Sequence, residues 1–244
     1  MRNLILVVVI CIIVSLLGLV GVRSLLSEEA LEGSNDVVGN YYQTLGTVYA
    51  VLLAFVVFVV WGQFNDARSA VAEEAKDLED LLRLAAGLST PVAANLTVKT
   101  RAYIRAVVDE EWATMAKGQA NAPAAQMMDD LGKDVLAINP TSPREEVVYG
   151  ELLARFNELS DARSRRLLHS RARMPGSLWA LLIVGSIVTI GSMYLFGVKS
   201  FVLHALLTGA MSGSVGFVLY LILDMDNPFW GDWQITPEPL RRLL

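Results

Sequence analysis

Four long stretches without a single charged side chain constrain this sequence more than any other feature. They lie at residues 4–22, 41–62, 175–198 and 200–223. A helix crosses the hydrocarbon core of a bilayer in about 20 residues, and each stretch has about that length. A lone segment in lipid satisfies its backbone hydrogen bonds only as a helix. The sequence therefore predicts an all-α fold with four transmembrane helices.

Charged residues are concentrated between the second and third apolar stretches. Of the 20 Lys and Arg, 15 lie in residues 63–174, together with 17 of the 25 Asp and Glu. We therefore predict transmembrane helices 1 and 2 in 1–62, a helical domain in water in 63–174, transmembrane helices 3 and 4 in 175–224, and a tail in 225–244. The net charge of −5 shows no basic patch for nucleic acid.

Arginines near the apolar stretches predict the orientation. The connection at 23–40 holds one of them, Arg23, and the last hairpin holds only Lys199. Five precede the third stretch: Arg163, Arg165, Arg166, Arg171 and Arg173. Because basic residues favour the cytoplasmic side, we expect a multi-pass protein of the inner cell membrane, with both termini and the insert in the cytoplasm. The first stretch is too long for a typical signal peptide, so we favour a retained helix.

The insert shows helical periodicity throughout. The second membrane helix is expected to continue into water as far as Gly87, followed by helices at about 97–117 and 123–137. Ser142 and Pro143 predict the start of a fourth helix, which leads to the third membrane stretch at Pro175. Two membrane helices would then extend into the cytoplasm and pack together.

The fourth apolar stretch carries small residues at helical spacing. Ala205, Gly209 and Gly213 are four apart, and Gly216 continues a neighbouring ridge. Small residues let helix backbones approach closely in lipid. We interpret them as a packing face within one subunit, with a subunit interface or a hinge as the alternative.

Motifs for chemistry are not found in the sequence. It has no nucleotide-binding glycine loop, metal-binding His and Glu pair or nucleophile with a base, so we do not expect an enzyme. No charged residue lies in the middle of an apolar stretch, which ranks a transporter low. On the second stretch Phe55, Val59 and Gln63 share one helix face. Such a stripe packs against other helices or lines a pore with a hydrophobic constriction.

Two local patterns lie just after the second and fourth apolar stretches. The first reads Gly-Gln-Phe-Asn-Asp-Ala at 62–67, followed by Glu-Ala-Lys at 74–76. The second is Asn227-Pro228-Phe229-Trp230-Gly231. Both resemble bestrophins, the four-pass pentameric anion channels. The topology is similar over nearly the full length, as in the bacterial bestrophin-like proteins. The resemblance implies a homo-oligomer, a pentamer in that family, whose neck is lined by Phe55, Val59 and Gln63. Gln63 differs from the aromatic residue that the family usually has there.

Animal bestrophins bind calcium with acidic residues after the fourth helix. Here only Asp232 follows the glycine, and Asp224 and Asp226 precede it, whereas calcium prefers six to eight oxygen ligands. We favour a turn without a cofactor, formed by the Asn227, Pro228, Phe229 and Gly231 motif. In that interpretation Phe229, Trp230 and Trp233 anchor at the bilayer interface.

The sequence thus supports an oligomeric ion channel in the lipid bilayer, with inorganic anions as the first candidate. The choice of anions follows from the resemblance. The alternative is a non-conducting membrane scaffold or stress sensor that binds a partner through its cytoplasmic helices.

Overall fold

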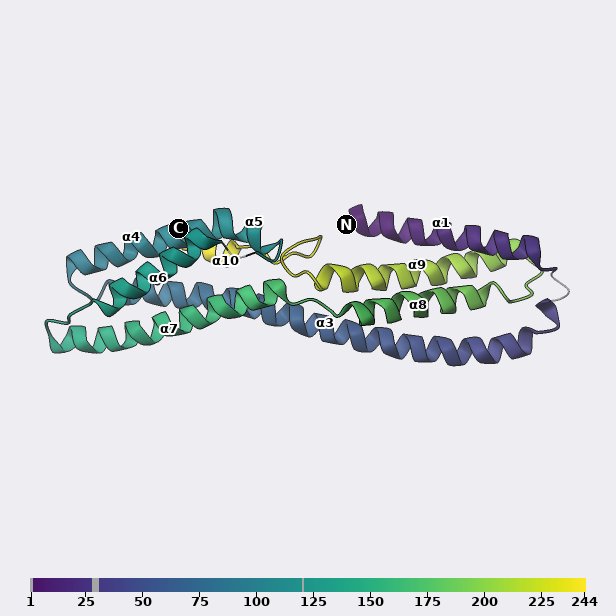
Figure 1. The fold of residues 1–244 in the computed structure, drawn as a ribbon, viewed down its shortest axis with the longest axis horizontal. Coiled ribbons are helices and arrows are strands. Elements are labelled where there is room, and N and C mark those ends of the chain that lie inside the picture. The colour runs from purple at the N-terminus through teal and green to yellow at the C-terminus, as the bar shows by residue number, and fades with distance from the viewer. Residues whose placement is uncertain (1, 28–30, 120) are drawn as a thin grey trace. The chain divides into compact units, whose positions relative to one another are not determined.

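The computed structural model describes residues 2–27, 31–119 and 121–244, and the regular elements within these ranges are helices (Figure 1). The chain divides into two compact units. Unit 1 comprises residues 1–62 and 174–226, and unit 2 comprises residues 63–173 and 227–244. The long helix α3 (Asn35–Ala85) contributes to both. The division follows the change from apolar to polar sequence, because each kind of surface suits a different solvent.

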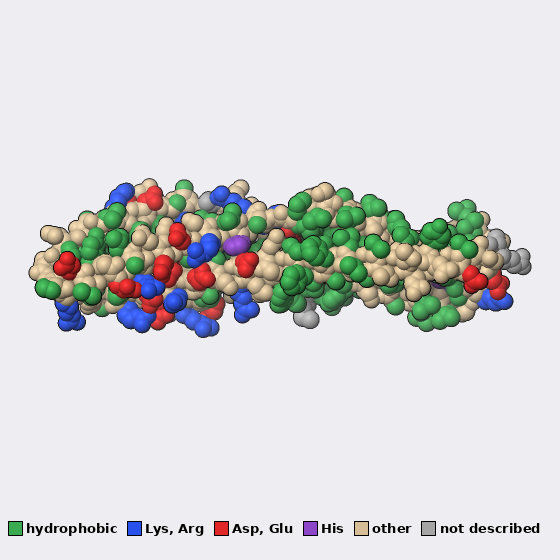
Figure 2. Space-filling view, turned by 90° about the horizontal axis from the view of Figure 1, so that it is seen from below, with side chains coloured by type: hydrophobic (Ala, Val, Ile, Leu, Met, Phe, Trp, Pro, Cys, Tyr) green, Lys and Arg blue, Asp and Glu red, His purple; other side chains and the backbone are tan. Residues whose placement is uncertain are grey.

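Unit 1 contains the apolar helices. They are α1 (Arg2–Leu25), the first part of α3, α8 (Gly176–Met193) and α9 (Phe201–Met225). By length and composition these four helices could cross a membrane, so the predicted apolar helices are present. Their large apolar side chains mostly point outward, as Figure 2 shows for one face. Small polar side chains are buried between them, among them Ser15, Thr189 and Ser212. This distribution suits a surface of lipid or of neighbouring apolar helices.

Hydrogen bonds hold the connections at one end of unit 1. The Asn35 amide donates to the Gly197 carbonyl at 3.1 Å and accepts from the Gly197 backbone N–H at 2.8 Å. Arg23 donates to the Val198 carbonyl at 3.0 Å. The hairpin between α8 and α9 is therefore tied to the end of α1 and the start of α3.

Unit 2 contains the second part of α3 and the charged helices. These are α4 (Thr90–Ala106), a π-helical turn (Val107–Glu111), α5 (Trp112–Met115), α6 (Ala122–Leu136), α7 (Pro143–Arg171) and α10 (Glu238–Arg241). Ser142 caps α7 as predicted, because its Oγ accepts a hydrogen bond from the Glu145 backbone N–H at 3.2 Å. Leu78, Leu131 and Leu159 are fully buried and belong to an apolar core within the unit.

Two sequence predictions about helix boundaries are wrong. The helix expected at 97–117 begins at Thr90, because Pro91 lies in its first turn, where no backbone N–H is needed. α7 ends at Arg171 and α8 begins at Gly176. The intervening residues are not helical, since Pro175 disfavours the helical conformation of the residue before it. Of the four apolar helices, only α3 therefore continues into unit 2.

Candidate functional site

The Phe55, Val59 and Gln63 stripe lies on a face of α3 that unit 1 does not cover. Phe55 is 64% exposed and Val59 is 40% exposed, and Gln63 is also exposed. The neighbouring Val56 and Val60 are only 4% and 1% exposed. One face of α3 thus packs inside the chain, while the stripe is left for lipid, another subunit or a pore.

The small residues of α9 face α1. A Cβ atom on Gly216 would lie 2.8 Å from the Cys11 Sγ, and one on Gly213 would lie 3.1 Å from the Ile12 Cδ1. Gly209 is less crowded, because a Cβ atom there would lie 3.7 Å from the Ile12 Cγ2. Ala205, at the start of this row of small residues, is partly exposed. In this chain the ridge lets α1 and α9 approach each other closely.

The Asn227 to Gly231 motif turns the chain after α9. Gly231 has a φ of 110°, a conformation that favours glycine. The Pro228 carbonyl accepts a hydrogen bond from the Ile235 N–H at 2.7 Å. The Asn227 side-chain oxygen accepts one from Arg173 at 2.8 Å. These bonds fold the start of the tail back within unit 2.

One predicted role in this motif is wrong. Phe229 is 1% exposed and packs edge-on against Trp112 in unit 2, with 5.5 Å between the ring centroids. A wholly apolar ring gains most from burial, and Phe229 is therefore a core residue of the tail rather than a bilayer anchor. Trp230 and Trp233 are 57% and 48% exposed, so their interfacial role stays a prediction.

Asp224, Asp226 and Asp232, the carboxylates considered for calcium, lie at or just after the end of α9. No group of three or more His, Cys, Asp or Glu side chains in the described ranges is placed to hold a metal ion. Asp226 instead accepts a hydrogen bond from the Met174 backbone N–H at 2.7 Å. Asp224 is 4% exposed.

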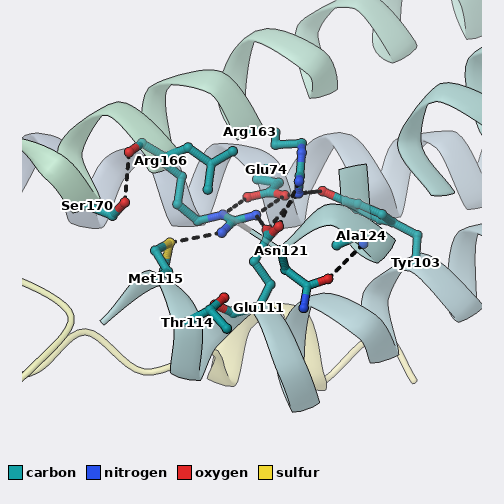
Figure 3. A network of polar contacts seen from close by, with 11 residues as sticks. Glu74, Tyr103, Glu111, Thr114, Met115, Asn121, Ala124, Arg163, Arg166 and Ser170 are labelled. Atoms are coloured by element: carbon teal, nitrogen blue, oxygen red, sulfur yellow. Dashed lines mark hydrogen bonds and ion pairs between the residues drawn. The ribbon is translucent and has the colours of Figure 1, made fainter. Parts of the chain in front are cut away.

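The most unusual feature of unit 2 is a buried cluster of charges, which the sequence patterns do not predict (Figure 3). Arg163 makes a bidentate pair with Glu111, with both N–O distances at 2.7 Å. Arg166 donates to Glu111 at 2.8 Å and to both carboxylate oxygens of Glu74. Glu74, Glu111 and Arg166 have no exposed surface, and Arg163 is 6% exposed. Two negative and two positive groups thus neutralise one another inside the unit.

Tyr103 and Met115 complete this buried charge cluster. The Tyr103 hydroxyl donates to Glu74 at 2.7 Å and accepts from Arg163 at 3.1 Å. The Met115 sulfur accepts from Arg166 at 3.1 Å. The cluster therefore joins α3, α4, the π-helical turn, α5 and α7. A π-helical turn often marks a special site, and here it places Glu111 toward the two arginines.

The surroundings lower the pKa of Glu111 and raise the pKa of Tyr103. Burial raises the pKa of Glu111, but hydrogen bonds and charges from Arg163 and Arg166 outweigh burial and hold the pKa below its ordinary value. Burial and the charge of Glu74 raise the pKa of Tyr103. These shifts favour the ionised form of Glu111 and the neutral form of Tyr103.

We expect the chain to lose stability in acid through Glu111. Because its pKa is lower in the folded state, the stabilisation is present above the ordinary value of 4.5 and is lost as the pH falls through the folded pKa. Thermal unfolding midpoints of the full chain in detergent should fall as the pH is lowered below about 4.5. Glu111→Gln should be less stable at neutral pH and should show a weaker acid dependence. An equal acid dependence in this variant would contradict the assignment.

Comparison with known proteins identifies the family. The Bestrophin-like domain model matches residues 8–240. The chain belongs to the Bestrophin-like family. The match covers both units of this bestrophin-like chain, including the α3 stripe, the buried charge cluster and the turn after α9. No individually curated protein matches the sequence.

Solved structures share the bestrophin-like fold. A variant of a bacterial Bestrophin homolog from Klebsiella pneumoniae has a TM-score of 0.73 at 12% identity, covering 99% of this chain and 97% of the other. A second variant has a TM-score of 0.74 at 12% identity, with coverage of 97% and 96%. A structure described as a membrane protein has a TM-score of 0.71 at 11% identity, with coverage of 100% and 96%. Identities this low support the fold rather than an activity.

Proposed function

We propose that this bestrophin-like protein assembles into a homo-oligomer in the inner membrane and conducts ions, with anions as the preferred class. The family and the fold support a membrane protein of this kind. The exposed stripe on α3 is the observation that carries the proposal, because it is a continuous line of side chains that this chain leaves unpacked. In a ring of subunits, pentameric by resemblance, these side chains would surround the axis.

The chemistry of the stripe fits a narrow apolar pore. Phe55 and Val59 would form a constriction that excludes water when closed. Gln63 would add a ring of neutral amides at one end, where N–H groups can face a passing anion. α3 has no charged residue between Asp36 and Asp66, so the pore would lack the carboxylate rings that favour cations. We place the insert and both termini on the cytoplasmic side, as the arginine distribution predicts.

Currents in planar bilayers test this proposal. Purified full-length protein should conduct, and Phe55→Ala should raise the single-channel conductance about twofold or more, because a smaller side chain widens the constriction. Val59→Ala should act in the same direction. Phe58→Ala is the matched control, since Phe58 is 75% exposed on α3 but lies at the edge of the stripe, about 60° around the helix from Phe55 and about 100° from Val59.

The same recordings distinguish conduction from the alternative, a non-conducting membrane scaffold. A purified oligomer that stays silent with every ion and voltage tested would reject conduction and favour a membrane scaffold. Equal effects of Phe55→Ala and Phe58→Ala would keep conduction but remove the stripe from the pore.

A further inference from the structure

Unit 2 has an open cavity of about 540 Å³ that the proposed pore does not use. One wall is the face of α3 formed by Phe64, Arg68, Val71 and Ala72. The other wall is the tail from residue 233 to 242. The volume lies in the range of small-molecule sites. The tail segment thus covers part of α3 without filling the space beside it.

The cavity combines an apolar lining with two guanidinium groups. Phe64 and Val71 are buried, whereas Arg68 is exposed and has no ion-pair partner within the described ranges. Arg242 pairs with Glu238 at 3.3 Å, and their side chains are 75% and 48% exposed. Exposed ion pairs of this kind contribute little to stability, so the Arg242 guanidinium can leave Glu238 for a better hydrogen-bond acceptor. The three charged groups sum to one positive charge, which suits a ligand with one negative charge.

The position along α3 places this cavity at the edge of the membrane. The apolar stretch ends at Gly62, and Arg68 follows about 9 Å further along the helix axis. This distance is similar to the depth of the headgroup layer, about 5–8 Å on each side, and an arginine side chain can reach back toward it. Trp61 precedes Arg68 by two helical turns on nearly the same face and is 46% exposed. Tryptophan next to arginine is typical of a membrane interface.

We propose that this cavity binds the phosphodiester headgroup of an anionic phospholipid. Arg68 and Arg242 donate to the phosphate oxygens, as guanidinium groups do in bidentate pairs. Phe64, Val71 and the tail contact the glycerol region of the lipid. A free phosphate would use the two arginines but would gain nothing from the apolar lining.

The lipid site and the proposed pore use different faces of α3. Arg68 follows Val59 by nine residues, which at about 100° per residue places it on the opposite side of the helix. Lipid binding therefore does not depend on conduction, and it can be tested on protein that carries no current. If the protein does conduct, the lipid contacts the same helix that lines the pore.

Lipid binding can be measured by native mass spectrometry of the full-length protein in a neutral detergent. The probes are dioctanoyl phosphatidylglycerol, dioctanoyl phosphatidylcholine and inorganic phosphate. The native protein should bind the phosphatidylglycerol at least tenfold more tightly than the phosphatidylcholine. Inorganic phosphate at equal concentration should not displace the bound phosphatidylglycerol. Arg68→Gln combined with Arg242→Gln should raise the dissociation constant at least tenfold. Arg101→Gln is the control, since Arg101 is exposed on α4 away from the cavity.

A steric variant tests the cavity itself. Ala72 is exposed and lines the cavity, so Ala72→Trp should reduce binding while both arginines remain. Unchanged thermal unfolding midpoints would show that the variants are folded. Equal binding of the two lipids, native-like binding by the double arginine variant, or native-like binding by Ala72→Trp would overturn the proposal. Displacement of the lipid by phosphate would also overturn the proposal and would assign the cavity to a soluble anion. An image of the assembled protein in which a neighbouring subunit fills the cavity would assign the cavity to subunit contact instead.

Discussion

Glu74→Gln is expected to lower the free energy of unfolding by about 3–5 kcal/mol, the typical cost of removing one partner from a buried ion pair. Arg166 would keep a full charge with no exposed surface and would have only Glu111 to balance it. Arg163 already occupies both oxygens of that same carboxylate. One positive charge in the buried charge cluster would therefore remain uncompensated.

An adjacent pair on the same two helices provides the control. Glu73 and Arg165 form an ion pair at 2.6 Å, but their side chains are 52% and 48% exposed. Glu73→Gln should cost less than about 1 kcal/mol. For a chain of this length, thermal unfolding midpoints measured by circular dichroism should fall by roughly 6–20 °C for Glu74→Gln. Similar midpoints for Glu74→Gln and Glu73→Gln would show that burial does not determine the cost.

Removing the opposite charge should restore part of the lost stability. In Glu74→Gln combined with Arg166→Met, the bidentate pair of Arg163 and Glu111 remains, and no unbalanced charge is left. Replacing both members of a buried pair is often nearly neutral. The double variant should therefore be more stable than Glu74→Gln alone. A simple sum of the two single losses would argue against a coupled cluster.

The helices of this protein could be predicted because their signals are local. An uncharged stretch about 20 residues long is enough to locate a membrane helix, and Ser142 and Pro143 show the start of α7 by the chemistry of a helix cap. The break between α7 and α8 depends on Pro175, whose effect on the preceding residue is also local. Helical periodicity on both sides of Pro175 predicts a continuous helix, but the local effect of the proline prevails.

The buried charge cluster could not be predicted in the same way, because its members are distant in sequence. Arg166 is 92 residues from Glu74 and 55 from Glu111. One signal was available: Glu111 lies on the apolar side of its predicted helix, where an unpaired charge would be costly. Arg163 and Arg166 belong to the arginines that predict the orientation, but both are buried in ion pairs. The predicted orientation therefore depends on the remaining arginines near the third apolar stretch.

The α3 stripe and the small residues of α9 show what helical periodicity can predict. Helical spacing groups Phe55, Val59 and Gln63 on one face and the glycines of α9 on another, but spacing alone does not tell what each face contacts. The structure distinguishes them, since the α3 stripe is exposed and Gly216 lies against Cys11. Residues that share a face can therefore be predicted from the sequence, whereas the partner of that face needs coordinates.

Gly216→Leu should separate α1 from α9 and destabilise unit 1 by about 1–3 kcal/mol or more, as inserting side-chain atoms into a packed interface does. The first added atom would already lie 2.8 Å from the Cys11 Sγ and 3.0 Å from its Cβ. Gly46→Leu is the matched control on α3, where an added Cβ meets no atom within 4 Å. The midpoint of thermal unfolding in detergent should fall for Gly216→Leu and stay near the native value for Gly46→Leu.

A pair of smaller substitutions tests whether the contact with Cys11 is the cause. Gly216→Ala alone should be destabilising, since its methyl group would meet the cysteine side chain. Cys11→Gly removes that side chain, and the next atom near the methyl group is the Val8 Cα at 4.0 Å. Combined with Cys11→Gly, the alanine should therefore cost less than it does in the native background, which a double-mutant cycle measures directly. Additive losses would place the strain of Gly216→Ala elsewhere than at the contact between α1 and α9.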